Sequence, residues 1–221
     1  MGRIVAIIPA RGGSRRLPRK NLAEFCGTTL LANKIRQLKN VERLDGIVVS
    51  SDSDEILSVA EEEGAECHRR RSEFCDEKSR SFGEVVASVC SEVSCDHVMW
   101  SPCTSPLMDE NSYSRAIEMY LDKVPSEGDS LTSFEETRRF YWDKNGPLNY
   151  RTGTEQPPSQ ELPPIFIWTA GVSLARREDM ISWKYLFGPC PVKLIVGKRE
   201  SVDIDDDLDL AKAQAWSMID R

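Results

Sequence analysis

Short apolar runs alternate with stretches of helical spacing along the first half of the chain. The apolar runs, which predict buried strands, cover residues 4–8, 46–51, 65–69 and 97–100. The stretches of helical spacing cover residues 29–38, 54–63, 81–93 and 109–122. Either Asp52 or Ser53 is placed to cap the second of these helices. This alternation predicts an α/β fold with a parallel sheet and helices on both of its faces.

The pattern changes after residue 122. Strands are expected at residues 130–135, 169–175 and 192–197, and a last helix within 201–218 follows a run of acidic residues that suits the positive end of a helix. Residues 140–164 are rich in Pro, Gly and Asn and have no clear period. They predict an excursion from the sheet, either a hairpin or an arm that contacts a second copy of the chain. No repeat or low-complexity linker divides the sequence, so residues 1–221 are expected to form a single domain.

Composition narrows the class of protein. With 221 residues and a hydrophobic content of 40%, the chain can bury a substantial core. The formal net charge of -7 argues against a general nucleic-acid-binding surface. The seven cysteines are irregularly spaced and include no CxxC pair, which predicts reduced thiols in a cytoplasmic protein. No apolar run approaches the ~20 residues of a membrane span, and neither a signal peptide nor a membrane partner is expected.

One loop is strongly basic against this acidic background. Residues 8–21 read IPARGGSRRLPRKN and follow the first predicted strand. Gly12 and Gly13 would let backbone N–H groups approach a ligand, and Ser14 adds a hydroxyl. The positive charges belong to Arg11, Arg15, Arg16, Arg19 and Lys20. Because open α/β sheets bind ligands at the carboxyl ends of their strands, the loop predicts a site for a polyanion such as a triphosphate, with a solvated basic loop as the alternative. The loop contains neither a Walker A sequence nor GxGxxG.

An acidic segment near the C-terminus predicts the complementary half of such a site. Asp203 and Asp205 flank Ile204, and in an extended chain this spacing puts both carboxylates on one face. Two carboxylates together with substrate phosphates suit Mg²⁺. The acidic residues that are expected to cap or decorate the last helix are Asp206, Asp207 and Asp209. Helix capping by the whole cluster is the alternative, and Asp52 is a weaker candidate for a metal ligand.

The basic loop resembles the signature loop of sugar nucleotidyltransferases. More narrowly, IIPARGGSRRLPRKN is similar to the loop of the cytidylyltransferases that activate acidic 2-keto sugars, namely the CMP-sialic acid (acylneuraminate) synthetases and, more distantly, the CMP-Kdo synthetases. Further segments of the chain resemble other motifs of this family and occur in the same order and spacing. They are VVSSDSDEI, RRRSEF, SPCTSPL, EQPPSQELPP and VDIDDDLDLAKA. The resemblance implies a Rossmann-like three-layer nucleotidyltransferase fold with a mostly parallel sheet and a small dimerisation excursion.

The resemblance assigns roles to residues of the basic loop. It implies that Arg11, Ser14 and Lys20 contact the CTP phosphates, with Lys20 on the α-phosphate and Arg11 on the β/γ side. Asn21 resembles a contact to the ribose or a phosphate, and a helix or turn cap is the alternative. The remaining nucleotide-binding candidates in the loop are Ala10, Gly12 and Gly13. Arg15 is a possible phosphate contact, whereas Arg16 and Arg19 are expected to be solvated.

Base recognition and the metal fall on other segments. The resemblance places cytosine recognition on Arg70 and Ser81, and the run of three arginines at residues 69–71 leaves this register open by one residue. It also places the Mg²⁺ ligands at Asp203 and Asp205. The predicted catalytic residues are therefore Arg11, Lys20, Asp203 and Asp205.

The acceptor side departs from the family pattern. Pro102 and Met108 stand where the family has a glutamine and an arginine. Pro158, Ile167 and Ser173 stand where it has two arginines and a tyrosine. Because a site built to hydrogen-bond its substrate rejects analogues strongly, these changes predict an acceptor other than N-acetylneuraminate. The candidate acceptor-binding residues are Thr104, Ser105, Arg139 and Tyr141, although the segment RRFYW is alternatively a strand face or a dimer contact.

The sequence thus predicts a Mg²⁺-dependent cytidylyltransferase that transfers CMP from CTP to an acidic 2-keto sugar and releases pyrophosphate. One alternative is a nucleotidyltransferase of the same fold that acts on Kdo or another acidic acceptor, or uses another nucleotide. Another is a non-catalytic nucleotide-binding domain. A homodimer is expected, with residues 140–168 reaching the partner because aromatic residues and prolines in an irregular stretch often form an interface.

Overall fold

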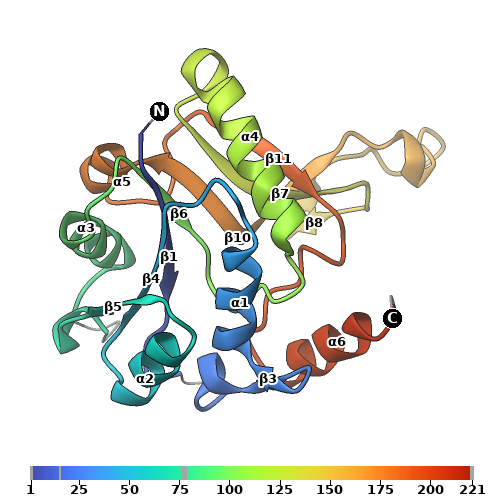
Figure 1. Ribbon diagram of the computed structural model, residues 1–221. Helices are drawn as coiled ribbons and strands as arrows, with labels where there is room; N and C mark the ends of the chain where they lie inside the picture. The colour runs from blue at the N-terminus through green and yellow to red at the C-terminus, as the bar shows by residue number, and fades with distance from the viewer. Residues whose placement is uncertain (1, 15, 76–78, 220–221) are drawn as a thin grey trace.

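The strands of the computed structural model, which describes residues 2–14, 16–75 and 79–219, form one large sheet in the order β11-β7-β10-β6-β1-β4-β5 (Figure 1). The strands are β1 (Ile4–Pro9), β4 (Gly46–Ser51), β5 (Glu66–Arg69), β6 (His97–Trp100), β7 (Ser130–Thr137), β10 (Ile165–Arg176) and β11 (Pro191–Val196). Strand β1 pairs parallel to β4 and β6, and β11 pairs parallel to β7, whereas β10 is antiparallel to both neighbours. The predicted, mostly parallel sheet is confirmed.

Helices cover both faces of this sheet. The first face packs against α1 (Leu30–Lys39), α2 (Asp54–Glu62), α4 (Glu110–Glu127) and α6 (Asp207–Ser217), and the second against α3 (Phe82–Glu92) and α5 (Arg177–Trp183) (Figure 1). Strand β1 explains this arrangement, because its side chains alternate between the faces. Ile4 and Ile8 join the core of the first face, and Val5 and Ile7 join that of the second. The three-layer fold expected from the sequence is confirmed.

Most helices begin at a side chain that caps the free backbone N–H groups of the first turn. The capping residues are Thr29 for α1, Ser53 for α2, Ser81 for α3, Asp109 for α4 and Asp206 for α6. The cap of α2 is therefore Ser53 rather than Asp52. Asp206 forms a reciprocal capping box with Asp209, as expected from the acidic run before the last helix.

Several short elements were not predicted from the pattern. Helix α5 and the two-residue strands β2 (Glu24–Phe25), β3 (Thr28–Thr29), β8 (Trp142–Asp143) and β9 (Gly146–Pro147) are too short to show a period. Strand β10 begins at Ile165, before the strand expected at 169–175, so the end of the expected 140–168 dimerisation segment belongs to the sheet. The pairing of β10 with β7 shifts register between Trp168 and Ser173, where Ala170 has a φ of 56°.

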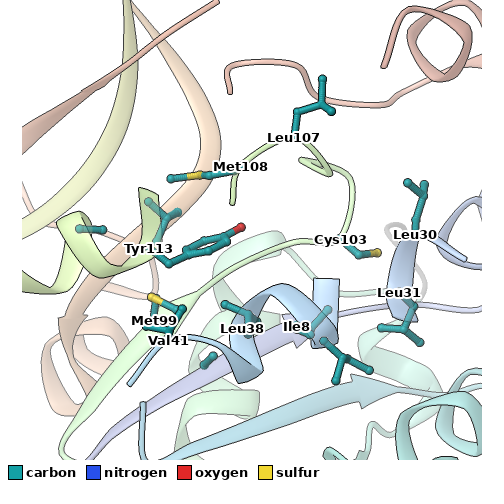
Figure 2. Close-up of a cluster of buried hydrophobic side chains, with 14 of the residues drawn as sticks. Ile8, Leu30, Leu31, Leu38, Val41, Met99, Cys103, Leu107, Met108 and Tyr113 are labelled. Atoms are coloured by element: carbon teal, nitrogen blue, oxygen red, sulfur yellow. The ribbon is translucent and has the colours of Figure 1, made fainter. Parts of the chain in front are cut away.

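A buried lysine organises the loop between β6 and α4. Lys34 of α1 is fully buried, and its Nζ donates hydrogen bonds to the carbonyl oxygens of Ser105, at 2.8 Å, and Met108, at 3.2 Å. It also donates to the hydroxyl of Tyr113. Burial lowers the pKa of Lys34 to about 7, although the nearby Cys103 and Asp109 act in the opposite direction. Figure 2 shows Cys103 and Met108 on this loop, with Tyr113 on α4 next to them.

The cysteines and the helix lengths bear on the predicted class of protein. All seven cysteines are free thiols, and two of them, Cys90 and Cys103, are buried in the core. Across residues 2–14, 16–75 and 79–219, no helix combines the length and the apolar character that crossing a membrane requires.

Candidate active site

A cavity of about 730 Å³ lies at the carboxyl ends of β1, β5 and β6. The basic loop after β1 contributes Arg11, Ser14, Arg16, Lys20 and Asn21 to its wall. The structure therefore brings four of the predicted nucleotide-binding residues of this loop together, along with Arg16, which the sequence interpretation treated as solvated. This is the position at which open α/β sheets bind their ligands.

The wall of the cavity has one sign of charge. Its charged members are Arg11, Arg16, Lys20, Arg70 and Arg80, and no carboxylate is among the described residues that line it. The protein as a whole carries a formal charge of -7, so this positive lining is a local feature. A low-dielectric cleft lined by one sign of charge attracts the opposite charge, and it suits a polyanion such as a nucleoside triphosphate.

The acidic segment near the C-terminus lies directly against this wall. Lys20 Nζ donates to the carbonyl oxygen of Ile204, at 2.8 Å, and to Asp205 Oδ1, at 3.1 Å. Arg16 Nη2 forms a second ion pair with the same carboxylate oxygen at 2.7 Å. Burial alone would raise the pKa of Asp205, but the hydrogen bond from Lys20 and the charges of Lys20 and Arg16 hold it below its usual value. Asp205 therefore stays ionised next to the loop.

Asp203 has a different environment. Burial raises the pKa of its carboxyl group, and the negative charge of Asp205 acts in the same direction, while a hydrogen bond from Thr104 opposes them. Residues 202–205 have no regular secondary structure, and the N–H of Ile204 donates to the carbonyl oxygen of Thr104 at 2.8 Å. The fold thus brings both predicted metal carboxylates to residues of the cavity wall, although neither aspartate itself lines the cavity.

Arg70 forms the wall at the end of β5. Only 6% of its surface is exposed, and burial lowers the pKa of its guanidinium. Its Nε donates to Ser50 Oγ at 3.1 Å and its Nη2 to the Ser50 carbonyl oxygen at 2.8 Å. The neighbours Arg69 and Arg71 form surface ion pairs with Asp54 and with Glu92. Among these three arginines, Arg70 is the one that lines the cavity, which agrees with the predicted register.

Ser81 also lines the cavity, but it has a structural role as well. Its hydroxyl caps α3, and Glu84 completes a capping box by accepting from the Ser81 N–H and hydroxyl. The next residue, Phe82, also lines the cavity, although 49% of its surface is exposed. The start of α3 therefore presents a hydroxyl and an aromatic ring to the ligand.

The small residues of the basic loop differ in their surroundings. The N–H of Gly12 donates to Asp52 Oδ1 at 2.8 Å, and a Cβ on Gly12 would lie 3.0 Å from Ser53 Cβ, so close approach to the start of α2 favours glycine. Gly13 has open space around it, and neither glycine has a positive φ. Ala10 is buried and donates to the Ser50 carbonyl oxygen. None of these three lines the cavity, and the prediction that the backbone N–H groups of Gly12 and Gly13 approach a ligand stays a prediction.

Asn21 and Asp52 support the loop from behind. Asn21 Nδ2 donates to the carbonyl oxygen of Arg11 at 2.8 Å, and its Oδ1 accepts from Cys103 Sγ at 3.1 Å. Asn21 therefore fixes the loop even though it also lines the cavity. Asp52 Oδ1 accepts from the N–H of Gly12, and the role of Asp52 as a weaker metal-ligand candidate stays a prediction.

The candidate acceptor residues do not form one group. Thr104 lines the cavity, whereas Ser105 is buried, and its hydroxyl has no hydrogen-bond partner among the residues that the structure describes. Arg139 is exposed and Tyr141 is half-buried, and neither lines the cavity. Asn149 holds both residues, since its Oδ1 accepts from the Tyr141 N–H and its Nδ2 donates to the Arg139 carbonyl oxygen, and the Tyr141 hydroxyl also donates to Thr137 Oγ1 of β7. Within one chain, the structure does not bring these two residues to the nucleotide side.

Several wall residues were not predicted from the sequence. Phe74 and Arg80 stack, with the guanidinium 5.3 Å from the ring centroid, and Trp100 closes the end of β6. Trp100 could have been found from its position as the last residue of a buried strand, whereas the loop between β5 and α3 carries no periodic signal. Arg15, the other possible phosphate contact, lies outside the described residues, and Arg19 pairs with Glu55 at the surface.

Comparison with known proteins identifies the family. The family described as "Cytidylyltransferase" matches residues 5–160, which is more than half of the chain. This chain belongs to the cytidylyltransferase family. It is therefore a nucleotidyltransferase, as the resemblance of its basic loop implied.

Relatives and solved structures agree with this assignment. The pseudaminic acid cytidylyltransferase of Campylobacter jejuni serotype O:23/36 is 29% identical over 94% of each chain. The N-acylneuraminate cytidylyltransferase of Escherichia coli O18:K1:H7 is 24% identical over 96% of this cytidylyltransferase and 51% of that relative. Among solved structures, a CMP:2-keto-3-deoxy-manno-octonic acid synthetase complexed with CTP matches with a TM-score of 0.72 at 15% identity, covering 99% of this chain and 100% of the other. A 4-diphosphocytidyl-2C-methyl-D-erythritol synthase from Anaerococcus prevotii matches with a TM-score of 0.66. At these identities the structures support the fold alone.

Proposed function

We propose that this cytidylyltransferase transfers CMP from CTP to an acidic 2-keto sugar of the sialic acid class and releases pyrophosphate. The observation that carries the proposal is the cavity at the end of the sheet, whose charged lining residues are five cations. Such a lining matches a triphosphate in the ground state and the charge that spreads over the phosphate oxygens as the reaction proceeds.

In the proposed reaction, a sugar hydroxyl oxygen attacks the α-phosphorus of CTP. A new oxygen–phosphorus bond forms, the bond from the α-phosphorus to the bridging oxygen breaks, and pyrophosphate takes the electron pair. Lys20 holds its ammonium group at the cavity wall, where it would stabilise the negative charge on the α-phosphate oxygens. Arg11 would bind the leaving pyrophosphate, and Arg70 with Ser81 would face the cytosine. The proton of the sugar hydroxyl group is released to bulk water.

A divalent cation fits the donor set behind the loop. Asp203 is half-buried, and burial raises the pKa of its carboxyl group, so a cation beside it would offset the cost of keeping it charged. Asp205 stays ionised nearby. Across the described residues, no group of three or more His, Cys, Asp or Glu side chains could enclose a metal by itself. This agrees with Mg²⁺, which typically takes one or two carboxylates and completes its shell with water and substrate phosphates. When bound there, Mg²⁺ would neutralise phosphate charge during the transfer.

The proposed acceptor is a nonulosonate related to pseudaminic or neuraminic acid. The relatives with these names match over nearly the whole chain. At Pro102 and Ile167 this chain lacks the polar side chains that the family pattern has there and that are expected to contact N-acetylneuraminate. An acceptor with fewer hydroxyl groups on that side would not lose hydrogen bonds at these positions.

A homodimer is part of the proposal. The excursion and the start of β10 expose large apolar side chains, including Phe140, Trp142, Phe166, Ile167 and Trp168. Exposed aromatic residues gathered on one segment are typical of a protein–protein interface. We expect a mass of twice the chain in light scattering at micromolar concentration, and a monomeric mass would contradict this part of the proposal.

The test is a pyrophosphate-release assay with CTP and Mg²⁺ and a panel of pseudaminic acid, N-acetylneuraminate and Kdo, with the CMP-sugar identified by mass spectrometry. We expect release with at least one nonulosonate. Lys20→Met should lower kcat by about 100-fold or more. Arg19→Met is the matched control, because Arg19 is the neighbouring residue but pairs with Glu55 at the surface.

Three outcomes would contradict the proposal in different ways. Turnover of Kdo alone would replace the acceptor and leave the CMP transfer intact. Turnover with another nucleoside triphosphate but not CTP would replace the donor. CTP binding without turnover of any acceptor would favour a non-catalytic nucleotide-binding domain.

A further inference from the structure

The guanidinium of Arg70 is fixed from behind by a single residue of β4. Both of its hydrogen bonds to β4 end on Ser50, one on the hydroxyl and one on the carbonyl oxygen. Ser50 is fully buried, and in the sheet it lies directly opposite His68 of β5. The Ser50 hydroxyl is therefore one of the groups that hold the Arg70 guanidinium, together with the Ser50 carbonyl oxygen and the side chain of Cys75.

A chain of hydrogen bonds continues from Ser50 to the protein surface. Ser50 Oγ lies 2.9 Å from His68 Nδ1, and His68 Nε2 lies 3.1 Å from Glu92 Oε2 at the end of α3. The other oxygen of Glu92 accepts from Arg71 and from Ser88. Strands β4 and β5 are neighbours in the sheet, with α3 packed beside them (Figure 1).

The chemistry of the groups fixes the direction of this chain. Arginine has donors only, so Ser50 Oγ accepts from Arg70, and the hydroxyl proton of Ser50 is free to donate to His68 Nδ1. In that arrangement Nδ1 accepts and Nε2–H donates to Glu92. Each group then has one matched partner.

Protonation of His68 would reverse one link. His68 Nδ1–H and Arg70 Nε–H would then both donate to Ser50 Oγ, and a second positive charge would lie close to the Arg70 guanidinium. His68 contacts the carboxylate of Glu92 from α3 and the hydroxyl of Ser50 from β4. The charged groups one contact further away are Arg70, which donates to Ser50, and Arg71, which donates to Glu92. Cys67, the preceding residue, points to the other face and contacts α2 through the Leu57 carbonyl oxygen.

We propose that Ser50, His68 and Glu92 are positioning residues that orient Arg70 for the nucleotide, and that protonation of His68 weakens nucleotide binding. The inference rests on the proposed function, since it takes Arg70 as a nucleotide contact. Although a serine, a histidine and a carboxylate are in line, this is not a nucleophilic site. Ser50 is fully buried and its hydroxyl oxygen already accepts from Arg70.

The test measures the dissociation constant of CTP with Mg²⁺ by calorimetry, without acceptor, at a mildly basic and a mildly acidic pH. His68→Phe removes both ring nitrogens, and we expect it to weaken binding about fivefold at basic pH, corresponding to one lost hydrogen bond. His68→Asn keeps an acceptor near the position of Nδ1 but cannot titrate. We expect this variant to bind like the unmodified protein at basic pH and to lose the additional weakening at acidic pH.

His97→Phe is the matched control, because His97 is the only other histidine of the sequence. It lies on β6, where Nδ1 contacts the Tyr120 hydroxyl at 2.9 Å, and it does not line the cavity. We expect its CTP affinity and pH dependence to match the unmodified protein. The titration of CTP itself is common to all the proteins and cancels in the comparison.

A steady-state measurement separates positioning from general damage. In His68→Phe we expect KM for CTP to rise while kcat stays within about twofold, as for loss of uniform binding. Ser50→Ala should weaken CTP binding at least as much as His68→Phe does. Adding His68→Phe to Ser50→Ala should weaken CTP binding little further, because the two residues act through the same chain of hydrogen bonds.

The inference is overturned if His68→Asn keeps the pH dependence of the unmodified protein, or if the two substitutions add independently. If His68→Phe does not fold, the Asn variant alone decides the question. Failure of the proposed function looks different, because the unmodified protein would then not bind CTP at all.

Discussion

Lys34 is the most deeply buried cation described above, and replacing it with methionine isolates the effect of its charge. The substitution keeps an unbranched side chain of similar length in α1. It removes the donor that serves the carbonyl oxygens of Ser105 and Met108 and the hydroxyl of Tyr113. Each buried acceptor left without a partner costs about 1–3 kcal/mol. At low pH this loss is partly offset, because the variant no longer buries a charge.

The pH dependence gives the magnitude. The pKa of Lys34 falls from 10.5 to about 7 on folding, because burial disfavours the charged form. Between these two values the unfolded chain binds more protons than the folded protein, so the free energy of unfolding rises with pH. The slope approaches about 1.4 kcal/mol per pH unit, which amounts to roughly 2–3 kcal/mol between about pH 6 and pH 9. Lys34→Met lacks this gain.

The assay is urea denaturation of the unmodified protein and of Lys34→Met at several values across that range, under reducing conditions. We expect the difference in free energy of unfolding to be smallest near pH 6 and to grow by roughly 2–3 kcal/mol by pH 9. Lys39→Met is the control, since Lys39 lies on the same helix but is exposed. Parallel curves for the unmodified protein and Lys34→Met would refute the reasoning, because they would mean that Lys34 has the same charge in both states.

Two further predictions concern packing and the metal carboxylate. A Cβ on Gly83 would lie 2.4 Å from the Lys184 carbonyl oxygen, so Gly83→Ala should lower the free energy of unfolding by about 1–3 kcal/mol. Gly13→Ala, which meets nothing within 4 Å, should leave it unchanged within about 0.5 kcal/mol; equal effects in urea denaturation would contradict the packing argument. Thr104→Val removes a hydrogen bond that lowers the pKa of Asp203, so this pKa should rise. The acid limb of the pH profile of kcat/KM should then move to higher pH. If the limb does not move, protonation of Asp203 is not its cause.

Much of the sheet could be predicted from the sequence, because strands buried on both faces appear as continuous apolar runs. Residues 46–51 and 97–100 were assigned with the bounds that the structure has. The antiparallel direction of β10 could not be predicted, since an apolar run is the same in either direction. The extra residues of β10 lie in a half-exposed stretch that includes Ile167, where tertiary pairing rather than periodicity decides the conformation.

The part of the site that could be predicted is the one where charged residues follow the end of a predicted strand. Lys20 and Asp205 were placed together by their chemistry, and the structure pairs them. Arg16 pairs with the same carboxylate but was expected to be solvated, because nothing in the sequence distinguishes it from the other arginines of the loop. The glycines of the loop illustrate a second limit. The sequence cannot distinguish a glycine needed for its dihedral angles from Gly12, which is needed because Ser53 lies close to it.

The contact between Lys20 and Asp205 joins positions 185 residues apart, and it has a consequence for synthesis on the ribosome. When a nascent chain has emerged as far as β10, the basic loop can already form, but the carboxylate that pairs with Lys20 and Arg16 has not yet been made. Contacts of such long sequence separation form late, because the entropy of closing the loop must be met first. We therefore expect the nascent chain to bind polyanions loosely and without turnover, and to become an enzyme only when its last helix has docked.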